Sequence, residues 1–132
     1  MGKVRFLVDT HAFLWAVLSP EKLTNLARSV FADRDAELLV SIATPWEMAI
    51  KAGIGKLENG AEILDNFESR VTASGYRVLE TSIKHTIISG YLPRYHKDPF
   101  DRLLIAQALD LNLPILSRDD IFDLYGVKRV WN

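Results

Sequence analysis

Short apolar runs alternate with segments of helical periodicity along most of this sequence, and this alternation constrains the fold more than any other feature. Strand-like runs lie at Val4 to Val8, Leu38 to Val40, Tyr76 to Leu79, Pro114 to Leu116 and Val127 to Trp131. Helical spacing is found at Ala12 to Leu18, Thr24 to Ala32, Ala61 to Val71, Ser82 to Ser89 and Leu103 to Leu111. Strands that alternate with helices predict an α/β fold, a three-layer α/β/α sandwich in which helices cover both faces of a mainly parallel sheet.

The composition is that of one globular domain, which we expect to span residues 1–132. Charged residues make up 25% of the chain, hydrophobic residues 48%, and the net charge is -1. No linker, repeat or low-complexity stretch interrupts the chain. The longest apolar run, Ala12 to Leu18, is too short to cross a bilayer and lacks the flanks of a signal peptide. We therefore expect a cytoplasmic protein that does not bind membranes.

Two segments have the composition of helix starts. In Thr44-Pro45-Trp46-Glu47, the threonine suits the N-cap, the proline suits the first turn, and Glu47 completes a capping box. Asp98-Pro99-Phe100-Asp101 has the same arrangement, with Asp98 at the N-cap. Gly53 and Gly55 are expected to end the first of these helices.

Acidic residues follow two predicted strands and open two predicted helices, all near one edge of the predicted sheet. Asp9 ends the first strand, and Asp119 and Asp120 come shortly after the strand at Pro114 to Leu116. Glu47 and Asp101 lie in first helical turns near the same edge. Ligands of open parallel sheets bind outside the carboxyl ends of the strands, so these acids are expected to converge there.

Converging carboxylates need positive charge nearby. Two of them about 5 Å apart repel by roughly 3 kcal/mol at an effective dielectric of about 20, so a dry cluster requires cations or shifted pKa values. The chain has no cysteine and only three histidines, and oxygen ligands favour Mg²⁺ or Mn²⁺, the ions suited to phosphate chemistry.

Several of these residues also have a purely structural interpretation. Asp98 is expected mainly to cap its helix, and Asp120 could cap a short helix at Ile121 to Tyr125. The helix dipole alone accounts for Asp101, and for Glu47 the capping box and a chemical role are equally plausible. Asp9 has no evident structural duty. His11 and His96 are expected to be surface groups or supporting neighbours of the metal ligands rather than ligands themselves. The tryptophans Trp15, Trp46 and Trp131 are expected to be core or interface residues rather than base-stacking platforms, and none of these residues is assigned a chemical role.

The motifs in this order resemble PIN-domain ribonucleases of the VapC toxin type. They are Leu7-Val8-Asp9-Thr10-His11-Ala12-Phe13-Leu14-Trp15, Trp46-Glu47 leading into Lys51 and Gly55-Lys56-Leu57, His96-Lys97-Asp98-Pro99-Phe100-Asp101-Arg102-Leu103-Leu104-Ile105-Ala106-Gln107-Ala108, and Ser117-Arg118-Asp119. The resemblance spans nearly the whole chain. Many family members have threonine where this chain has Ser117, which keeps the hydroxyl.

This resemblance implies a PIN-like fold and a Mg²⁺- or Mn²⁺-dependent endoribonuclease, the toxin of a type II toxin–antitoxin pair. It further implies a homodimer that is inhibited by a small cognate, VapB-like antitoxin. By position, the metal-binding and catalytic acids would be Asp9, Glu47, Asp101 and Asp119, with Asp120 as the alternative fourth acid.

Two arginines near the acids have an expected role, and two other protein classes remain as alternatives. Arg102 or Arg118 would steady phosphate oxygens, or pair with the neighbouring acids. The alternatives are a haloacid-dehalogenase-like phosphatase, which requires an acid where this chain has His11, and a non-catalytic signalling receiver domain, which requires paired acids after its first strand.

Overall fold

The structure, a computed structural model, describes residues 3–132 and contains one parallel sheet with strand order β3-β2-β1-β4-β5. The central strand β1 (Val4–Val8) pairs with β2 (Ala36–Ser41) on one side and with β4 (Ile115–Leu116) on the other. The outer strands are β3 (Arg77–Leu79) and β5 (Arg129–Val130). The predicted α/β fold with a mainly parallel sheet is confirmed.

Side chains that alternate along the strands build a separate core on each face of the sheet. Val8, Val40 and Leu116 point into one core, whereas Leu7 and Ile115 point into the other. All five side chains are buried. Apolar residues on both faces explain why these strands read as continuous apolar runs in the sequence.

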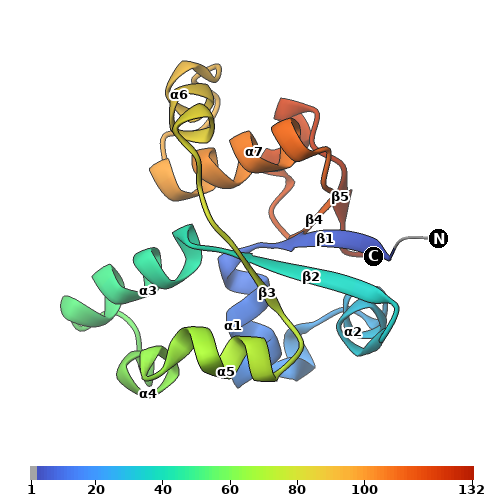
Figure 1. The fold of residues 1–132 in the computed structure, drawn as a ribbon, viewed down its shortest axis with the longest axis vertical. Coiled ribbons are helices and arrows are strands. Elements are labelled where there is room, and N and C mark those ends of the chain that lie inside the picture. Colours follow the sequence, from blue (N-terminus) through green and yellow to red (C-terminus); the bar gives the residue numbers. More distant parts are fainter. Residues whose placement is uncertain (1–2) are drawn as a thin grey trace.

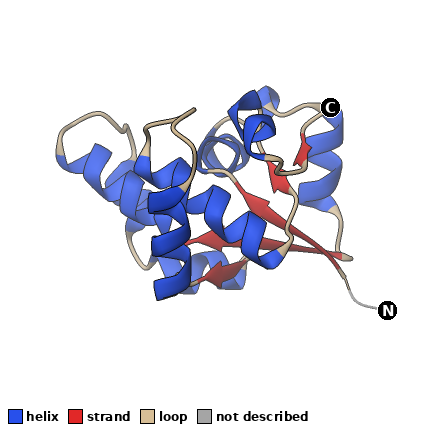
Figure 2. Ribbon diagram, turned by 90° about the horizontal axis from the view of Figure 1, so that it is seen from above, coloured by secondary structure: helices blue, strands red, loops and turns tan. Residues whose placement is uncertain are grey.

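Helices cover both faces, as Figures 1 and 2 show, and this arrangement confirms the three-layer sandwich. The first face carries α1 (Thr10–Leu18), η1 (Pro20–Lys22), α2 (Asn25–Ala32), α4 (Gly60–Leu64) and α5 (Phe67–Ala73). The second carries α6 (Ile83–Tyr91), α7 (Pro99–Leu111) and the 3₁₀-helix η2 (Asp120–Tyr125). Between them, α3 (Ala43–Gly53) leaves the carboxyl end of β2 and contributes Ala43 to one core and Met48 to the other.

Two sequence-based predictions about the helices were wrong. The segment Ala61 to Val71 is not one helix, because Asn66 adopts a left-handed backbone conformation (φ 51°) that separates α4 from α5. Asparagine tolerates this conformation better than most residues. Thr44 is not an N-cap, because α3 begins one residue earlier with Ile42 at the cap position. The predicted end of α3 at Gly53 is confirmed, and Gly55 follows it with φ 73°.

The carboxyl ends of β1 and β2 lie on the same side of the molecule, the left side of Figure 1, where α3 leaves the sheet and α7 begins. Asp9 connects β1 directly to α1 there. Within residues 3–132, no helix is both long and apolar enough to cross a membrane.

Candidate metal centre

Asp9 is a buried carboxylate at the end of the central strand. Its side chain is 3% exposed, and its backbone N–H donates to the carbonyl of Leu116 on the neighbouring strand at 3.0 Å. Asp9 occupies the N-cap position of α1, yet within the described structure its side chain makes no capping hydrogen bond. The Ser117 hydroxyl donates to Asp9 Oδ2 at 3.0 Å. The carboxylate therefore does not cap α1, which agrees with the absence of an evident structural role for Asp9 in the sequence.

Glu47 lies in the first part of α3 and is also buried, 5% exposed. It does not complete a capping box, because the helix begins before Thr44. Instead its Oε2 accepts a hydrogen bond from Lys51 Nζ at 2.8 Å, one helical turn along. Its Oε1 is buried without a hydrogen-bond partner among the described residues. A buried carboxylate oxygen left in this state is costly unless a cation or a donor reaches it.

A buried hydrogen bond connects the helices that carry Asp9 and Glu47. The hydroxyls of Thr10, at the start of α1, and Thr44, near the start of α3, lie 3.1 Å apart. Both threonines are buried. This contact fixes the two helix starts relative to each other, and with them the two acids.

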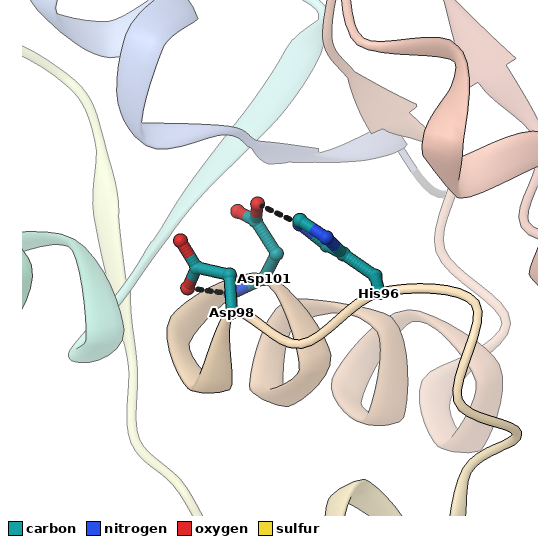
Figure 3. A group of neighbouring side chains, drawn as sticks. All are labelled: His96, Asp98 and Asp101. Carbon is teal, nitrogen blue, oxygen red and sulfur yellow. Dashed lines mark hydrogen bonds and ion pairs between the residues drawn. The ribbon is translucent and has the colours of Figure 1, made fainter.

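Asp101 belongs to the first turn of α7 and approaches the same region from the other face of the sheet. Its Oδ2 lies 2.7 Å from Nε2 of His96, as Figure 3 shows. The loop before α7 that carries His96 is held by Tyr125, whose hydroxyl accepts from the His96 backbone N–H and donates to the Pro93 carbonyl. His96 therefore orients Asp101, while Tyr125 orients His96.

The electrostatics show that three of the predicted acids share one site. Burial above all, and then the charges of the neighbouring Asp101 and Glu47 carboxylates, raise the pKa of Asp9 to about 7, against the lowering effect of the Ser117 hydrogen bond. Burial also raises the pKa of Asp101, against the lowering effect of His96. The charges of Asp9, Glu47 and Asp101 therefore oppose one another in a poorly solvated region.

Asp98 is an N-cap residue, as predicted. Its Oδ1 accepts hydrogen bonds from the backbone N–H groups of Phe100 at 2.8 Å and of Asp101 at 3.2 Å. It also completes the one set of three or more acidic or histidine side chains in residues 3–132 whose ligand atoms all lie within 4.8 Å of one another, namely His96, Asp98 and Asp101. The predicted acids Asp9, Glu47 and Asp101 are spaced more widely than this set.

Asp119 and Asp120 are exposed and lie at the mouth of the site. With Asp9 they line a cleft of about 370 Å³. Asp119 caps η2 by accepting from the Ile121 N–H, so the prediction that Asp120 is the cap was wrong. Ser117 connects this segment to the centre, because its hydroxyl accepts from the Asp119 N–H and donates to Asp9. Ser117 thus ties the backbone of Asp119 to the Asp9 carboxylate, and both acids line the same cleft.

Arg102 does not have the predicted role at the phosphate. Its side chain is 3% exposed, and its guanidinium donates to backbone carbonyls at the end of α6 and in the segment that joins α6 to α7. The acceptors are Ser89, Gly90, Leu92, Pro93 and His96. A planar guanidinium can satisfy such a ring of carbonyls. Arg102 therefore shapes the loop that presents His96, and it faces away from solvent.

Sequence reasoning did not match three polar residues to the acids that they contact. Lys51 could have been found, because its spacing of four residues from Glu47 puts both on one helix face. Ser117 was noted only through the resemblance, although its position directly after β4 is informative. His96 was expected to be a surface group or a supporting neighbour of the ligands, but its specific contact with Asp101 depends on the path of the loop between Pro93 and Pro99.

Comparison with known proteins places this geometry in a family. The sequence matches the PIN domain family over residues 6–128, and the chain belongs to that family. The sequence matches no curated protein.

Solved structures show the same fold at low sequence identity. A chain of VapBC2 from Rickettsia felis, crystallised bound to a DNA fragment from their promoter, gives a TM-score of 0.70 at 13% identity, covering 98% of this chain and 100% of that chain. A toxin–antitoxin complex from Klebsiella pneumoniae gives 0.59 at 16% identity, covering 87% of each chain. VapBC-1 from nontypeable Haemophilus influenzae gives 0.62 at 14% identity, covering 96% and 97%. These similarities concern the fold.

Proposed function

We propose that this PIN-domain protein is a Mg²⁺- or Mn²⁺-dependent endoribonuclease, the toxin of a type II toxin–antitoxin pair. The observation that carries the proposal is the state of Asp9. It is a buried acid that ends the central strand, and two further acids from different helices act on its pKa. A protein gains no stability from such a group, so its presence at the ligand-binding edge of the sheet favours a functional role.

The residues present suit a divalent cation. The donors near Asp9 are carboxylate and hydroxyl oxygens, which Mg²⁺ and Mn²⁺ prefer. Glu47 Oε1 is buried without a hydrogen-bond partner among the described residues, so one oxygen of this carboxylate is free to bind a cation. We assign Asp9, Glu47 and Asp101 as the ligands, and Asp119, at the mouth of the cleft, as the fourth acid.

The neighbouring groups hold these acids in place. Ser117 orients Asp9 by a hydrogen bond, and His96 does the same for Asp101. Lys51 balances part of the charge of Glu47. A divalent cation bound among such acids lowers the pKa of water and offsets the charge that develops on a phosphodiester during hydrolysis. The chain supplies the fixed positions, and Asp119 is exposed at the point where an RNA phosphate enters.

The toxin role is supported by the solved structures of similar fold, and a toxin of this type implies an antitoxin partner. One matched structure is a toxin–antitoxin complex. A groove of about 110 Å³ between α1 and α5, lined mainly by apolar side chains that include Phe13, Val17, Phe67 and Tyr76, suits an apolar antitoxin segment. We propose that a small VapB-like protein occupies it and inhibits the enzyme in the cytoplasm.

We also propose a homodimer. Ile83, Ile87 and Tyr91 are exposed and recur every fourth residue along α6, so that they form one apolar stripe. Exposed stripes of this kind are typical of protein interfaces. Sedimentation of the purified protein at several concentrations tests the dimer, and a monomer at all concentrations would contradict it.

Purified protein incubated with RNA tests the enzymatic proposal. We expect cleavage in Mg²⁺ or Mn²⁺, none in EDTA, and recovery when the cation is restored. Full activity after exhaustive chelation would remove the metal from the mechanism, and the absence of cleavage with either cation would overturn the nuclease assignment. Purification from the native host tests the toxin role. Recovery of partner-free protein, together with normal growth on overexpression, would contradict it.

Membership of the PIN domain family removes the basis of the two alternatives drawn from the sequence. His11 stands where a haloacid-dehalogenase-like phosphatase needs an acid, and Asp9 is followed by Thr10 where a receiver domain needs paired acids. No contact among the described residues favours either class.

A further inference from the structure

The cleft beside Asp9 contains an aromatic ring and a cation that the metal centre does not use. Besides Asp9, Asp119 and Asp120, it is lined by His11, Trp15 and Arg118. His11 and Trp15 are four residues apart on α1, and their ring centroids lie 6.3 Å apart. The helix that begins at Asp9 therefore leads from the metal centre along the wall of this cleft.

Trp15 is a fixed platform. It is half-buried, and its ring packs against the buried Trp131 with a centroid distance of 5.8 Å and an interplanar angle of 51°. Trp15 also lines the cleft. A ring held from one side and open on another is suited to stacking with a flat ligand, because its orientation is already determined.

Cations gather at the Trp15 ring. The Arg118 guanidinium carbon lies 6.0 Å from the ring centroid and Lys22 Nζ lies 5.9 Å from it. Arg118 is exposed, and its guanidinium makes no hydrogen bond or ion pair within residues 3–132. An exposed cation–π contact is weak, so Arg118 can exchange the ring for a ligand at little cost.

The charges in the cleft select the kind of group that fits. Asp9, Asp119 and Asp120 repel an anion that is not accompanied by a cation, so a bare phosphate is disfavoured between them and the Trp15 ring. A nucleobase is flat and neutral, stacks on an indole, and offers N–H groups to carboxylates. The attached phosphate can meanwhile contact Arg118.

We infer that this cleft binds a nucleobase of single-stranded RNA, adjacent to the phosphodiester at the metal centre, with the base stacked on Trp15 and a phosphate at Arg118. The inference rests on the proposed nuclease function and assigns its substrate contact. Every base has a π-face, so the Trp15 contact increases affinity for unpaired RNA without selecting one base. Bases in a duplex are already stacked and cannot reach the ring.

Steady-state cleavage of a short, mixed-sequence single-stranded RNA tests this assignment. Trp15→Leu keeps apolar bulk against Trp131 but removes the aromatic face, and we expect KM to rise about tenfold with little change in kcat. Trp15→Phe keeps an aromatic face and should restore a KM near that of the wild type. The matched control is Phe31→Leu, because Phe31 is also a half-buried aromatic residue, lies on α2 and does not line the cleft. It should leave KM unchanged.

A binding measurement separates this inference from the proposed function. In the background of Asp101→Asn, which prevents cleavage, single-stranded RNA should quench tryptophan fluorescence, and duplex RNA should not. Trp15→Phe in that background should remove most of the quenching. Cleavage by the wild type with unchanged KM in Trp15→Leu, or equal quenching by duplex RNA, would overturn the stacking site and leave the nuclease intact. A wild type that neither cleaves nor binds RNA would instead overturn the function itself.

Discussion

Acidic residues are handled in opposite ways in two regions of this protein. Outside the candidate metal centre, the half-buried Asp110 pairs with Lys84 Nζ at 2.6 Å and with His85 Nε2 at 2.9 Å, and the exposed Asp123 pairs with Arg129. These partners hold the pKa of Asp110 and of Asp123 below the ordinary value. At the carboxyl edge of the sheet, burial and neighbouring acids raise the pKa of Asp9 and Asp101 instead.

This difference indicates that the acids at the carboxyl edge of the sheet, Asp9 and Asp101, do not stabilise the fold. In each of these pairs a positively charged partner balances the carboxylate, whereas Asp9 and Asp101 lie near other carboxylates in a region with little water. A fold retains such an arrangement when a ligand supplies the missing positive charge. The comparison therefore predicts that substitutions in the two regions will have opposite consequences for activity and for stability.

The largest expected effect is on catalysis. Asp101→Asn removes one negative charge from the centre while keeping the shape of the side chain, and RNA cleavage should fall by at least about 100-fold. Asp110→Asn is the matched control on the same helix, and because Asp110 lies outside the candidate metal centre, activity should stay within about twofold of the wild type. Circular dichroism should show both variants folded. Normal turnover by Asp101→Asn would remove this residue from the site.

The next effect is on stability without metal. The pKa of Asp9 rises from 3.8 to about 7 on folding, so the folded state holds this proton more tightly than the unfolded chain. The free energy of unfolding therefore falls by roughly 4 kcal/mol as the pH rises from about 4 to about 7, and it falls no further above that pH. Asp9→Asn should abolish this loss. Urea unfolding in EDTA at pH 4, 6 and 8 measures it. Parallel pH dependence in the two proteins would contradict the account.

Sequence patterns predicted the sheet and the position of the acids well, because both depend on local rules. Apolar runs mark strands that are buried on both faces, and an acid placed directly after such a strand must lie at its carboxyl edge. Asp9 and Asp101 were placed near this edge for these reasons. The Asp98 cap was predicted because Pro99 and the following helical run mark a helix start unambiguously.

The remaining errors concern backbone details that no periodicity encodes. The capping box at Glu47 failed because α3 begins before Thr44, whose hydroxyl contacts Thr10 instead. The prediction for Arg102 was wrong because this arginine donates to backbone carbonyls. Every residue has such a carbonyl, so the sequence does not indicate which ones the guanidinium will reach. A sequence shows which side chains are present, but it does not show where the carbonyls of a loop will point.

A smaller effect should distinguish the two exposed acids. Asp119→Asn keeps a capable N-cap for η2, yet as a loss of the fourth acid it should lower cleavage about tenfold. Asp120→Asn, the neighbouring control, should stay within about twofold of the wild type. If Asp119→Asn is silent and Asp120→Asn is inactive, the assignment of the fourth acid is reversed.

The smallest effect is expected at Asp98. Serine is also a good N-cap, so Asp98→Ser should change stability by only a few tenths of a kcal/mol and leave most activity, whereas Asp101→Ser should be inactive. Initial rates and thermal unfolding of both variants measure the contrast. Equal loss of activity would show that Asp98 acts as a ligand together with His96 and Asp101.

Melting curves of the wild type and Asp9→Asn, each with EDTA and with Mg²⁺, test most directly whether the edge acids form one metal-binding cluster. In EDTA, Asp9→Asn should melt higher, because one of the opposing charges is gone. Mg²⁺ at about 100 times its dissociation constant should stabilise the wild type by roughly 2.7 kcal/mol and the variant by less, which narrows or reverses the order. A wild type that is more stable in EDTA and gains nothing from Mg²⁺ would contradict the cluster.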